Sequence, residues 1–189
     1  MSGNLAYQND FEEKRRVELI DGKVVMMAPA AAPNHNHVVV NLSRLFSNYL
    51  YGKKCTPFSD GVNLFLDDKN RFVPDFMVIC DPDKIKDDGV HGAPDLVVEV
   101  LSFGTVKNDR GHKKNVYESG GVSEYWLVNS TDKSVEVYLL ENGKYTLDSV
   151  YTLYPAEKMA DEEKTAIVTE FKRHLYDDLI IRLDDIFGD

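Results

Sequence analysis

The chain has 189 residues, and 22 Lys and Arg against 32 Asp and Glu give it a formal net charge of −10 at pH 7. We expect one domain over residues 1–189, burying roughly 70% of the surface of the extended chain. The hydrophobic share of 43% excludes global disorder. No apolar run reaches the ~20 residues of a membrane span, so no membrane partner is expected. The acidity lowers the expectation of tight nucleic-acid binding, although a local basic patch remains compatible with it.

The cellular compartment is predicted from the N-terminus and the cysteines. The N-terminal segment contains no apolar stretch typical of a signal peptide. Cys55 and Cys80 are too few and too isolated to predict a disulfide framework or a zinc site. We therefore expect a cytoplasmic protein with reduced thiols, and a homodimer is the most common state of such a protein.

The N-terminal half predicts a hairpin, a helix and two longer strands. Asp21-Gly22 lies between two β-rich runs over Arg16–Met27, which is a strong hairpin signal. Apolar residues at spacings of three and four predict an amphipathic helix from about His35 to Tyr51, ended by Gly52. We then expect strands at Gly61–Leu66 and Arg71–Cys80, and a polar loop at Asp81–Gly92.

The C-terminal half predicts a buried strand, a helix and a series of strands. The run Asp95–Ser102 is apolar on both faces, as in a strand that is covered on both sides. The other expected elements are a helix at Asn108–Ser119, strands at Ser123–Asn129, Ser134–Leu140 and Lys144–Tyr151, a helix-prone stretch at Ala156–Thr165 and a closing strand at Leu179–Leu183. This order favours an α/β (α+β) fold with a central mixed β-sheet flanked by α-helices.

Three carboxylates stand in segments where apolar residues are expected. They are Glu18 in the first hairpin strand, Asp75 after Pro74, and Glu99 within Leu96–Leu101. A buried carboxylate is costly unless it meets a cation, a donor or a metal ion. For any one of these acids, a strand-end position that faces solvent or bonds a backbone N–H is the more common explanation. Three together favour a functional site.

The predicted helix after the Glu99 strand carries a lysine that could reach this site. Asp109, Lys113 and Tyr117 follow one another at spacings of four and share a helix face. The spacing alone favours a solvated Asp109–Lys113 pair over a contact between Lys113 and Glu99. Carboxylates that bind a hard cation, together with a lysine, nevertheless make a phosphodiesterase site possible.

Other motifs are weaker or absent. His35 and His37 are two apart on a helix and would not face each other as a metal pair. Arg110 and Lys114 belong to a local basic patch that includes Lys107 and Lys113, and a solvated face is its simpler explanation. The sequence contains no phosphate-binding glycine loop, no serine-hydrolase elbow and no zinc motif of the HExxH or paired CxxC type.

Six blocks of the sequence, in this order, resemble the Uma-type restriction endonuclease family, a branch of the PD-(D/E)XK nuclease superfamily. They are Val17–Gly22, Pro33–His35, Val73–Asp75, Ala93–Ser102, Asp109–Lys113 continuing to Tyr117, and Gly121–Val128. The resemblance covers a core of about residues 11–150, followed by a C-terminal extension of about 151–189. It implies a restriction-endonuclease-like fold.

The resemblance also implies roles for particular residues. Asp75 and Glu99 match the metal-binding acids, and Glu18 matches an additional acid that binds the metal or a water. The superfamily lysine, two residues after the second acid, is replaced here by Leu101, and Lys113 on the next helix is the matching position. His35 matches a recurring histidine, which with Tyr117 is a possible accessory residue.

Three functions are compatible with the sequence. The first is a Mg²⁺-dependent or Mn²⁺-dependent endonuclease acting on DNA, with Asp75, Glu99, the backbone carbonyl of Val100 and Glu18 as metal ligands. Lys113 would position the attacking water, and Arg110 and Lys114 would contact substrate phosphate. The second is an inactive binding or regulatory protein of the same fold, which the acidity favours. The third is a metal-independent carboxylate-pair hydrolase such as a glycosidase.

Overall fold

Most of the strands belong to two mixed sheets. The structure is a computed structural model, and it describes residues 17–27, 32–153, 169–172 and 178–188. Sheet A has the strand order β2-β1-β5-β4-β8-β7, and sheet B has the order β12-β11-β10-β9-β6-β3. A small third sheet pairs β13 with β14. The α/β class is thus confirmed, with the strands gathered in two main sheets instead of one.

The bounds of the strands and helices follow the chain. The strands are β1 Val17–Ile20, β2 Lys23–Met26, β3 Thr56–Ser59, β4 Leu64–Asp67, β5 Asn70–Phe72, β6 Phe76–Ile79, β7 Ile85–Lys86, β8 Gly89–His91, β9 Leu96–Val100, β10 Glu124–Asn129, β11 Ser134–Glu141, β12 Lys144–Thr152, β13 Glu170–Lys172 and β14 Ile180–Arg182. The helices are α1 Pro33–Leu50, α2 Val106–Asn108, α3 Lys114–Gly120 and α5 Leu183–Phe187, with a 3₁₀ turn at Pro82–Lys84 and a π-helical turn at Asp109–Lys113.

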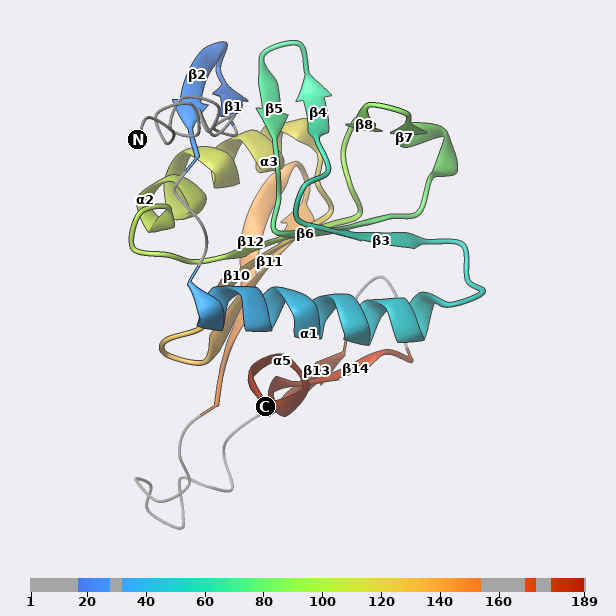
Figure 1. The fold of residues 1–189 in the computed structure, drawn as a ribbon, viewed down its shortest axis with the longest axis vertical. Coiled ribbons are helices and arrows are strands. Elements are labelled where there is room, and N and C mark those ends of the chain that lie inside the picture. Colours follow the sequence, from blue (N-terminus) through green and yellow to red (C-terminus); the bar gives the residue numbers. More distant parts are fainter. Residues whose placement is uncertain (1–16, 28–31, 154–168, 173–177, 189) are drawn as a thin grey trace, which may run out of the picture.

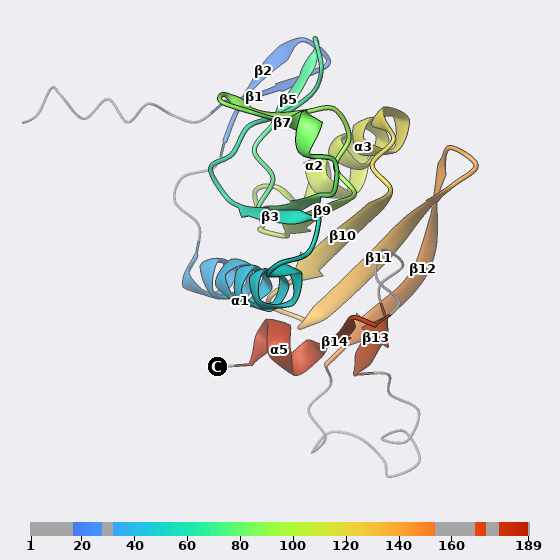
Figure 2. The same ribbon diagram turned by 90° about the vertical axis from the view of Figure 1, so that its right-hand side faces the viewer.

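Sheet B separates two hydrophobic cores. Helix α1 lies along one face of the sheet, where α5 and the β13–β14 pair also pack (Figures 1 and 2). Asn41 of α1 donates hydrogen bonds of 3.1 Å to the carbonyl oxygens of Ile186 and Gly188, which holds the C-terminal segment against α1. Helix α3 and the inner face of sheet A cover the opposite face. The two faces of β9 therefore meet different environments.

Several predicted elements are confirmed with small changes of length. The hairpin turn has positive φ at Asp21 and Gly22, as its two-residue geometry requires. Helix α1 begins at Pro33, because a proline at the first helical position needs no hydrogen-bonded N–H. The three strands after residue 122 are confirmed, and Trp126 is fully buried.

Other predictions are wrong in their detail. The single strand expected at Arg71–Cys80 is two strands in different sheets, because the chain leaves sheet A at Val73-Pro74 and enters sheet B after Asp75. Strand β3 was not predicted. The polar loop expected at Asp81–Gly92 contains the short β7–β8 hairpin. The helix-prone stretch at Ala156–Thr165 lies outside the described residues.

The expectation that the two cysteines are isolated thiols is also wrong. Strands β3 and β6 are antiparallel with Thr56 opposite Ile79, so Cys55 and Cys80 come next to each other at the following register position. The structure joins them by a disulfide bond, and it contains no free cysteine.

None of the helices within the described ranges is both long and apolar enough to cross a membrane.

Candidate metal-dependent nuclease site

Asp75 and Glu99 are brought together by the pairing of β6 with β9. The two strands are antiparallel with Phe76 opposite Val98, so the next register position sets Asp75 opposite Glu99. Directly opposite residues in an antiparallel pair have Cβ atoms about 5 Å apart. The N–H of Val100 donates a 2.7 Å hydrogen bond to Oδ2 of Asp75, which holds this carboxylate against β9.

Glu99 is the one polar residue in the otherwise apolar strand β9, and it lies on the side that faces α3. Alternation directs Val98 and Val100 toward α1, and it directs Val97 and Glu99 toward α3 and sheet A. Only 3% of Glu99 is exposed. Its Oε1 accepts a 2.9 Å hydrogen bond from the hydroxyl of Tyr117 and lies 3.1 Å from Nζ of Lys113. The core at this face is therefore built around an ion pair.

The helical segment after β9 supplies the partners of Glu99. It runs through α2, the π-helical turn and α3, and it buries Asp109, Lys113 and Tyr117 on one face. The shared face that their spacing predicts is thus confirmed, while the solvated Asp109–Lys113 pair is not, since Lys113 is 5% exposed and Asp109 is 1% exposed. A π-helical turn within a helix is often found at a functional site.

Glu18 joins the same cluster from sheet A. Its Oε1 lies 2.9 Å from Nζ of Lys113 and accepts a 3.2 Å hydrogen bond from the N–H of Val73. Alternation along β1 places Glu18 on the inner face and Leu19 on the outer face. Lys113 thus links acids from both main sheets, since Glu99 belongs to sheet B.

Asp109 is a member of the cluster that the sequence did not single out as a site residue. Its Oδ1 is buried, makes no hydrogen bond among the described residues, and lies 3.7 Å from Nζ of Lys113. The four-residue spacing between Asp109 and Lys113 was the only signal for this contact. The cluster around Lys113 therefore contains three carboxylates, those of Glu18, Glu99 and Asp109.

Burial and mutual charge shift the pKa values in this cluster. Burial raises the pKa of Glu99 well above its usual value, and the Lys113 ammonium offsets only part of the rise. Burial also raises the pKa of Asp109, again against the effect of Lys113. Burial alone would lower the pKa of Lys113, but the surrounding carboxylates outweigh it and hold this pKa above its usual value. Lys113 is thus a permanent cation at neutral pH.

His35 approaches the site from the first turn of α1. Its Nε2 lies 3.2 Å from Oδ2 of Asp75, and this hydrogen bond raises the pKa of the imidazole despite the opposing effect of burial. Its Nδ1 is buried without a hydrogen-bond partner among the residues that the structure describes. His35 therefore contacts one of the predicted metal ligands, as an accessory residue would.

Comparisons with known proteins bear on this site. The Uma2 family model, described as "Putative restriction endonuclease", matches residues 4–166. This chain belongs to the Uma2 family. Two curated relatives from Synechocystis sp., the uncharacterized proteins slr1290 and sll1609, are 35% and 30% identical to it. The alignments cover 68% and 69% of this chain, and 69% and 76% of the two relatives.

A solved structure shares the fold. It is the crystal structure of a putative nuclease of the DUF820 group from Anabaena variabilis, which superposes with a TM-score of 0.64 at 17% identity. The match covers 91% of this chain and 89% of that one. The expected mixed α/β fold is therefore shared with a solved structure.

The donors at the Uma2 site suit a hard divalent cation in kind. Asp75 and Glu99 offer carboxylate oxygens and Val100 offers a backbone carbonyl, which are the ligands that Mg²⁺ and Mn²⁺ prefer. Among the residues described, no group of three or more His, Cys, Asp and Glu is arranged to hold a metal ion as it stands. The charges favour a cation nonetheless, because four carboxylates (Asp75, Glu99, Glu18 and Asp109) interact electrostatically, while Lys113 is the shared cation of only the last three.

The two residues expected to contact substrate phosphate lie apart from this cluster and face β11. Arg110 forms an ion pair of 2.5 Å with Glu136. Nζ of Lys114 lies 3.6 Å from the ring centre of Tyr138, and partial burial lowers its pKa. A phosphate contact by either residue stays a prediction. A second run of basic residues, at 14–16, lies outside the described part of the chain.

Proposed function

We propose that this protein is a divalent-metal-dependent endonuclease that hydrolyses phosphodiester bonds, with DNA as its substrate. The observation that carries the proposal is the placement of Lys113. The superfamily position for the lysine is Leu101, yet Nζ of Lys113 reaches within 3.1 Å of the Glu99 carboxylate from the following helix. Lys113 on the helix thus takes the place near Glu99 that a lysine on the strand takes in the superfamily.

Each residue has a role that follows from its chemistry. Asp75, Glu99 and the carbonyl of Val100 would hold Mg²⁺ or Mn²⁺, and Glu18 would complete the ligand set or orient a water. The cation would supply charge to polarise the scissile phosphate and to lower the pKa of a bound water. Lys113, as a permanent cation, would position the attacking water and stabilise negative charge that develops on the phosphate.

Tyr117 and His35 act as positioning residues in this scheme. The Tyr117 hydroxyl donates to Oε1 of Glu99 and restricts the rotation of that carboxylate. His35 does the same for Asp75 through its 3.2 Å contact. Preorganised carboxylates reduce the reorganisation that would otherwise oppose the reaction.

The test combines metal binding with cleavage. We expect Mn²⁺ titrated calorimetrically into the wild type to release or absorb heat, and this signal to disappear in Asp75→Asn and Glu99→Gln. Both variants should also lose metal-dependent cleavage of plasmid DNA. Glu124→Gln is the matched control, because Glu124 is equally buried but bonds to Trp126 on the α1-facing side of sheet B. Cleavage that persists in both site variants would refute the assignment.

A second candidate function is a nuclease-fold protein that binds a partner without cleaving it. The net charge of −10 favours this candidate, as do the contacts of 2.9 Å and 3.1 Å through which Lys113 already pairs with Glu18 and Glu99. Such a protein would bind no Mn²⁺ and would cleave no DNA in the same experiment. A metal-independent hydrolase would differ again, because its activity would survive chelation.

A further inference from the structure

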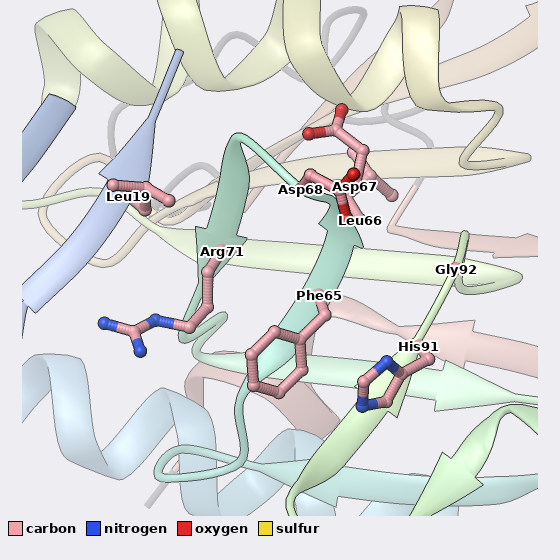
Figure 3. Close-up of a pocket in the computed structure, with 8 residues that line it drawn as sticks. All are labelled: Leu19, Phe65, Leu66, Asp67, Asp68, Arg71, His91 and Gly92. Carbon is pink, nitrogen blue, oxygen red and sulfur yellow. The ribbon is translucent and has the colours of Figure 1, made fainter. Parts of the chain in front are cut away.

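The outer face of sheet A carries an open hollow of about 630 Å³. The inner face of sheet A packs against the core that contains Glu18 and α3. The hollow and the acids of the proposed metal site therefore lie on opposite sides of sheet A. The residues that line it are Leu19, Phe65, Leu66, Asp67, Asp68, Arg71, His91 and Gly92 (Figure 3). None of them belongs to the proposed metal site.

The register of the strands places four of these residues in one row. Leu19 on β1 is opposite Arg71 on β5, Arg71 is opposite Phe65 on β4, and Phe65 is opposite His91 on β8. Residues in register on neighbouring strands project from the same face of a sheet. Four strands therefore present an aliphatic side chain, a guanidinium and two aromatic rings side by side.

The two rings stack on each other, and the outer face of the pair, the Phe65–His91 surface, is what a further ring would contact. The centroids of Phe65 and His91 are 4.6 Å apart and their planes differ by 18°. Figure 3 shows both rings projecting from the strands in the same direction. The His91 side chain is 44% exposed while its Nε2 lies 2.9 Å from Oδ1 of Asp88, so the ring keeps exposed surface that a third ring could contact. A nucleobase is a flat ring that stacks on such aromatic surfaces with little dependence on its sequence.

Arg71 places a positive charge beside the rings. Its Nη2 donates a 3.3 Å hydrogen bond to the carbonyl of Val17, while its Nε is buried and has no hydrogen-bond partner among the described residues. A guanidinium is always charged and binds phosphate through several donors at once. Asp67 and Asp68 lie at the turn, on the side away from the guanidinium (Figure 3), so a phosphate would be favoured at the Arg71 end alone.

The hollow lies close to the proposed site along the chain. Glu18 and Leu19 are consecutive, and Arg71 precedes Asp75 by four residues. Four extended residues span at most about 14 Å. One strand of nucleic acid covers that distance in about four nucleotides at a rise of 3.4 Å. Because the route from one face of the sheet to the other is longer than this straight span, a single substrate molecule needs at least about four nucleotides to contact both faces.

We propose that this hollow binds one unpaired base of the nucleic-acid substrate, stacked on the Phe65–His91 surface, with an adjoining phosphate held by Arg71. The base is unpaired because both faces of a base within a duplex are already covered by its neighbours. The proposal rests on the proposed function for the identity of the substrate. It narrows that substrate to nucleic acid with a single-stranded segment a few nucleotides from the cleaved bond.

The experiment measures binding without cleavage. The wild type is titrated, in the presence of a chelator, into a fluorescent single-stranded oligodeoxythymidylate and into a duplex of the same length. We expect tighter binding of the single strand, and a loss of about tenfold or more in its affinity in Phe65→Leu and in Arg71→Gln. Lys86→Gln on exposed β7 of the same sheet removes the same charge as Arg71→Gln and should leave the affinity unchanged.

Failure of this inference is distinguishable from failure of the proposed function. Equal affinity of the wild type, Phe65→Leu and Arg71→Gln for the single strand would overturn the inference, even if plasmid cleavage depends on Asp75 and Glu99. An equal affinity of the wild type for single strand and duplex would overturn it as well. Conversely, binding that depends on Phe65 and Arg71 without any metal-dependent cleavage would support the inference and refute the nuclease. Circular dichroism of each variant excludes unfolding as the cause.

Discussion

On the side of sheet B that meets α1, β9 contributes Leu96, Val98 and Val100, and the residues packed there are almost entirely apolar. On the other side the same strand contributes Val97 and Glu99, and Glu99 meets Lys113 and Tyr117. Both sides are equally inaccessible to water, since every residue of β9 is buried. Burial alone therefore does not predict whether one side of a strand is apolar or carries charged groups. The apolar side supplies stability, whereas the charged side depends on the mutual neutralisation of its members.

The largest effect should come from removing the one cation of the charged side. Lys113→Met leaves Glu18, Glu99 and Asp109 without their shared partner, so we expect a loss of about 3–5 kcal/mol in the free energy of unfolding. Urea denaturation measures this loss. Lys114→Met is the control, because Lys114 is the next residue but is partly exposed. It contacts the Tyr138 ring, and such a contact is typically worth about 1 kcal/mol. Equal losses in the two variants would contradict the central role of Lys113.

The apolar side should respond differently to truncation. Leu42 of α1 is fully buried, so Leu42→Ala should cost about 2–5 kcal/mol through lost apolar burial and the cavity left behind. Heat of Mn²⁺ binding should not change, because α1-facing packing does not supply the metal ligands. Val40→Ala, on the exposed face of the same helix, should fall within about 0.5 kcal/mol of the wild type. A metal-binding defect in folded Leu42→Ala would show that the two sides are coupled.

The smallest effect concerns how stability varies with pH in the absence of metal. Because the pKa of Glu99 is raised in the folded state, its contribution to stability is fully present below the unfolded pKa of about 4.3 and is lost as the pH rises through the folded pKa. Glu99→Gln removes this dependence. Relative to the wild type, the variant should therefore gain stability as the pH rises from about 4 toward neutral.

Denaturation curves across that pH range, with a chelator present, give the measurement. Glu124→Gln serves as the reference, since it removes a buried carboxylate from the opposite side of the sheet. A difference between wild type and Glu99→Gln that stays constant with pH would show that Glu99 keeps an ordinary pKa in the folded protein.

Local patterns predicted the elements that depend on neighbours in sequence. The Asp21-Gly22 turn, the apolar spacing in α1 and the β-prone runs of β10 and β11 all depend on residues close in sequence, and these elements are present. The division of Arg71–Cys80 between two sheets was not predicted, because a continuous apolar run does not reveal which partner each half takes. Pro74 marks the break, because a proline cannot donate a hydrogen bond to a neighbouring strand.

Only some residues of the candidate site were predicted, because local patterns reveal unusual residues but not the pairing of distant strands. Glu18, Asp75 and Glu99 stand out as carboxylates in apolar segments. Lys113 stands out by its helical spacing after the Glu99 strand, and the resemblance to the family matches it as well. The row of Leu19, Arg71, Phe65 and His91 was missed, because it depends on the pairing of β1 with β5 and of β4 with β8, which lie apart in the sequence. The Cys55–Cys80 bond was missed likewise, since β3 itself was not predicted.

That bond closes a covalent ring in the chain, with a sequence separation of 25 residues between its two cysteines. Strands β3, β4, β5 and β6 all lie within the ring, together with Phe65, Arg71 and Asp75. The exposed turn at residues 67–69 is a natural point of attack for a protease within it. A cut there would leave two fragments that migrate as one band on a denaturing gel until a thiol reagent is added. The oxidation state of this pair could thus be determined from a protease digest alone.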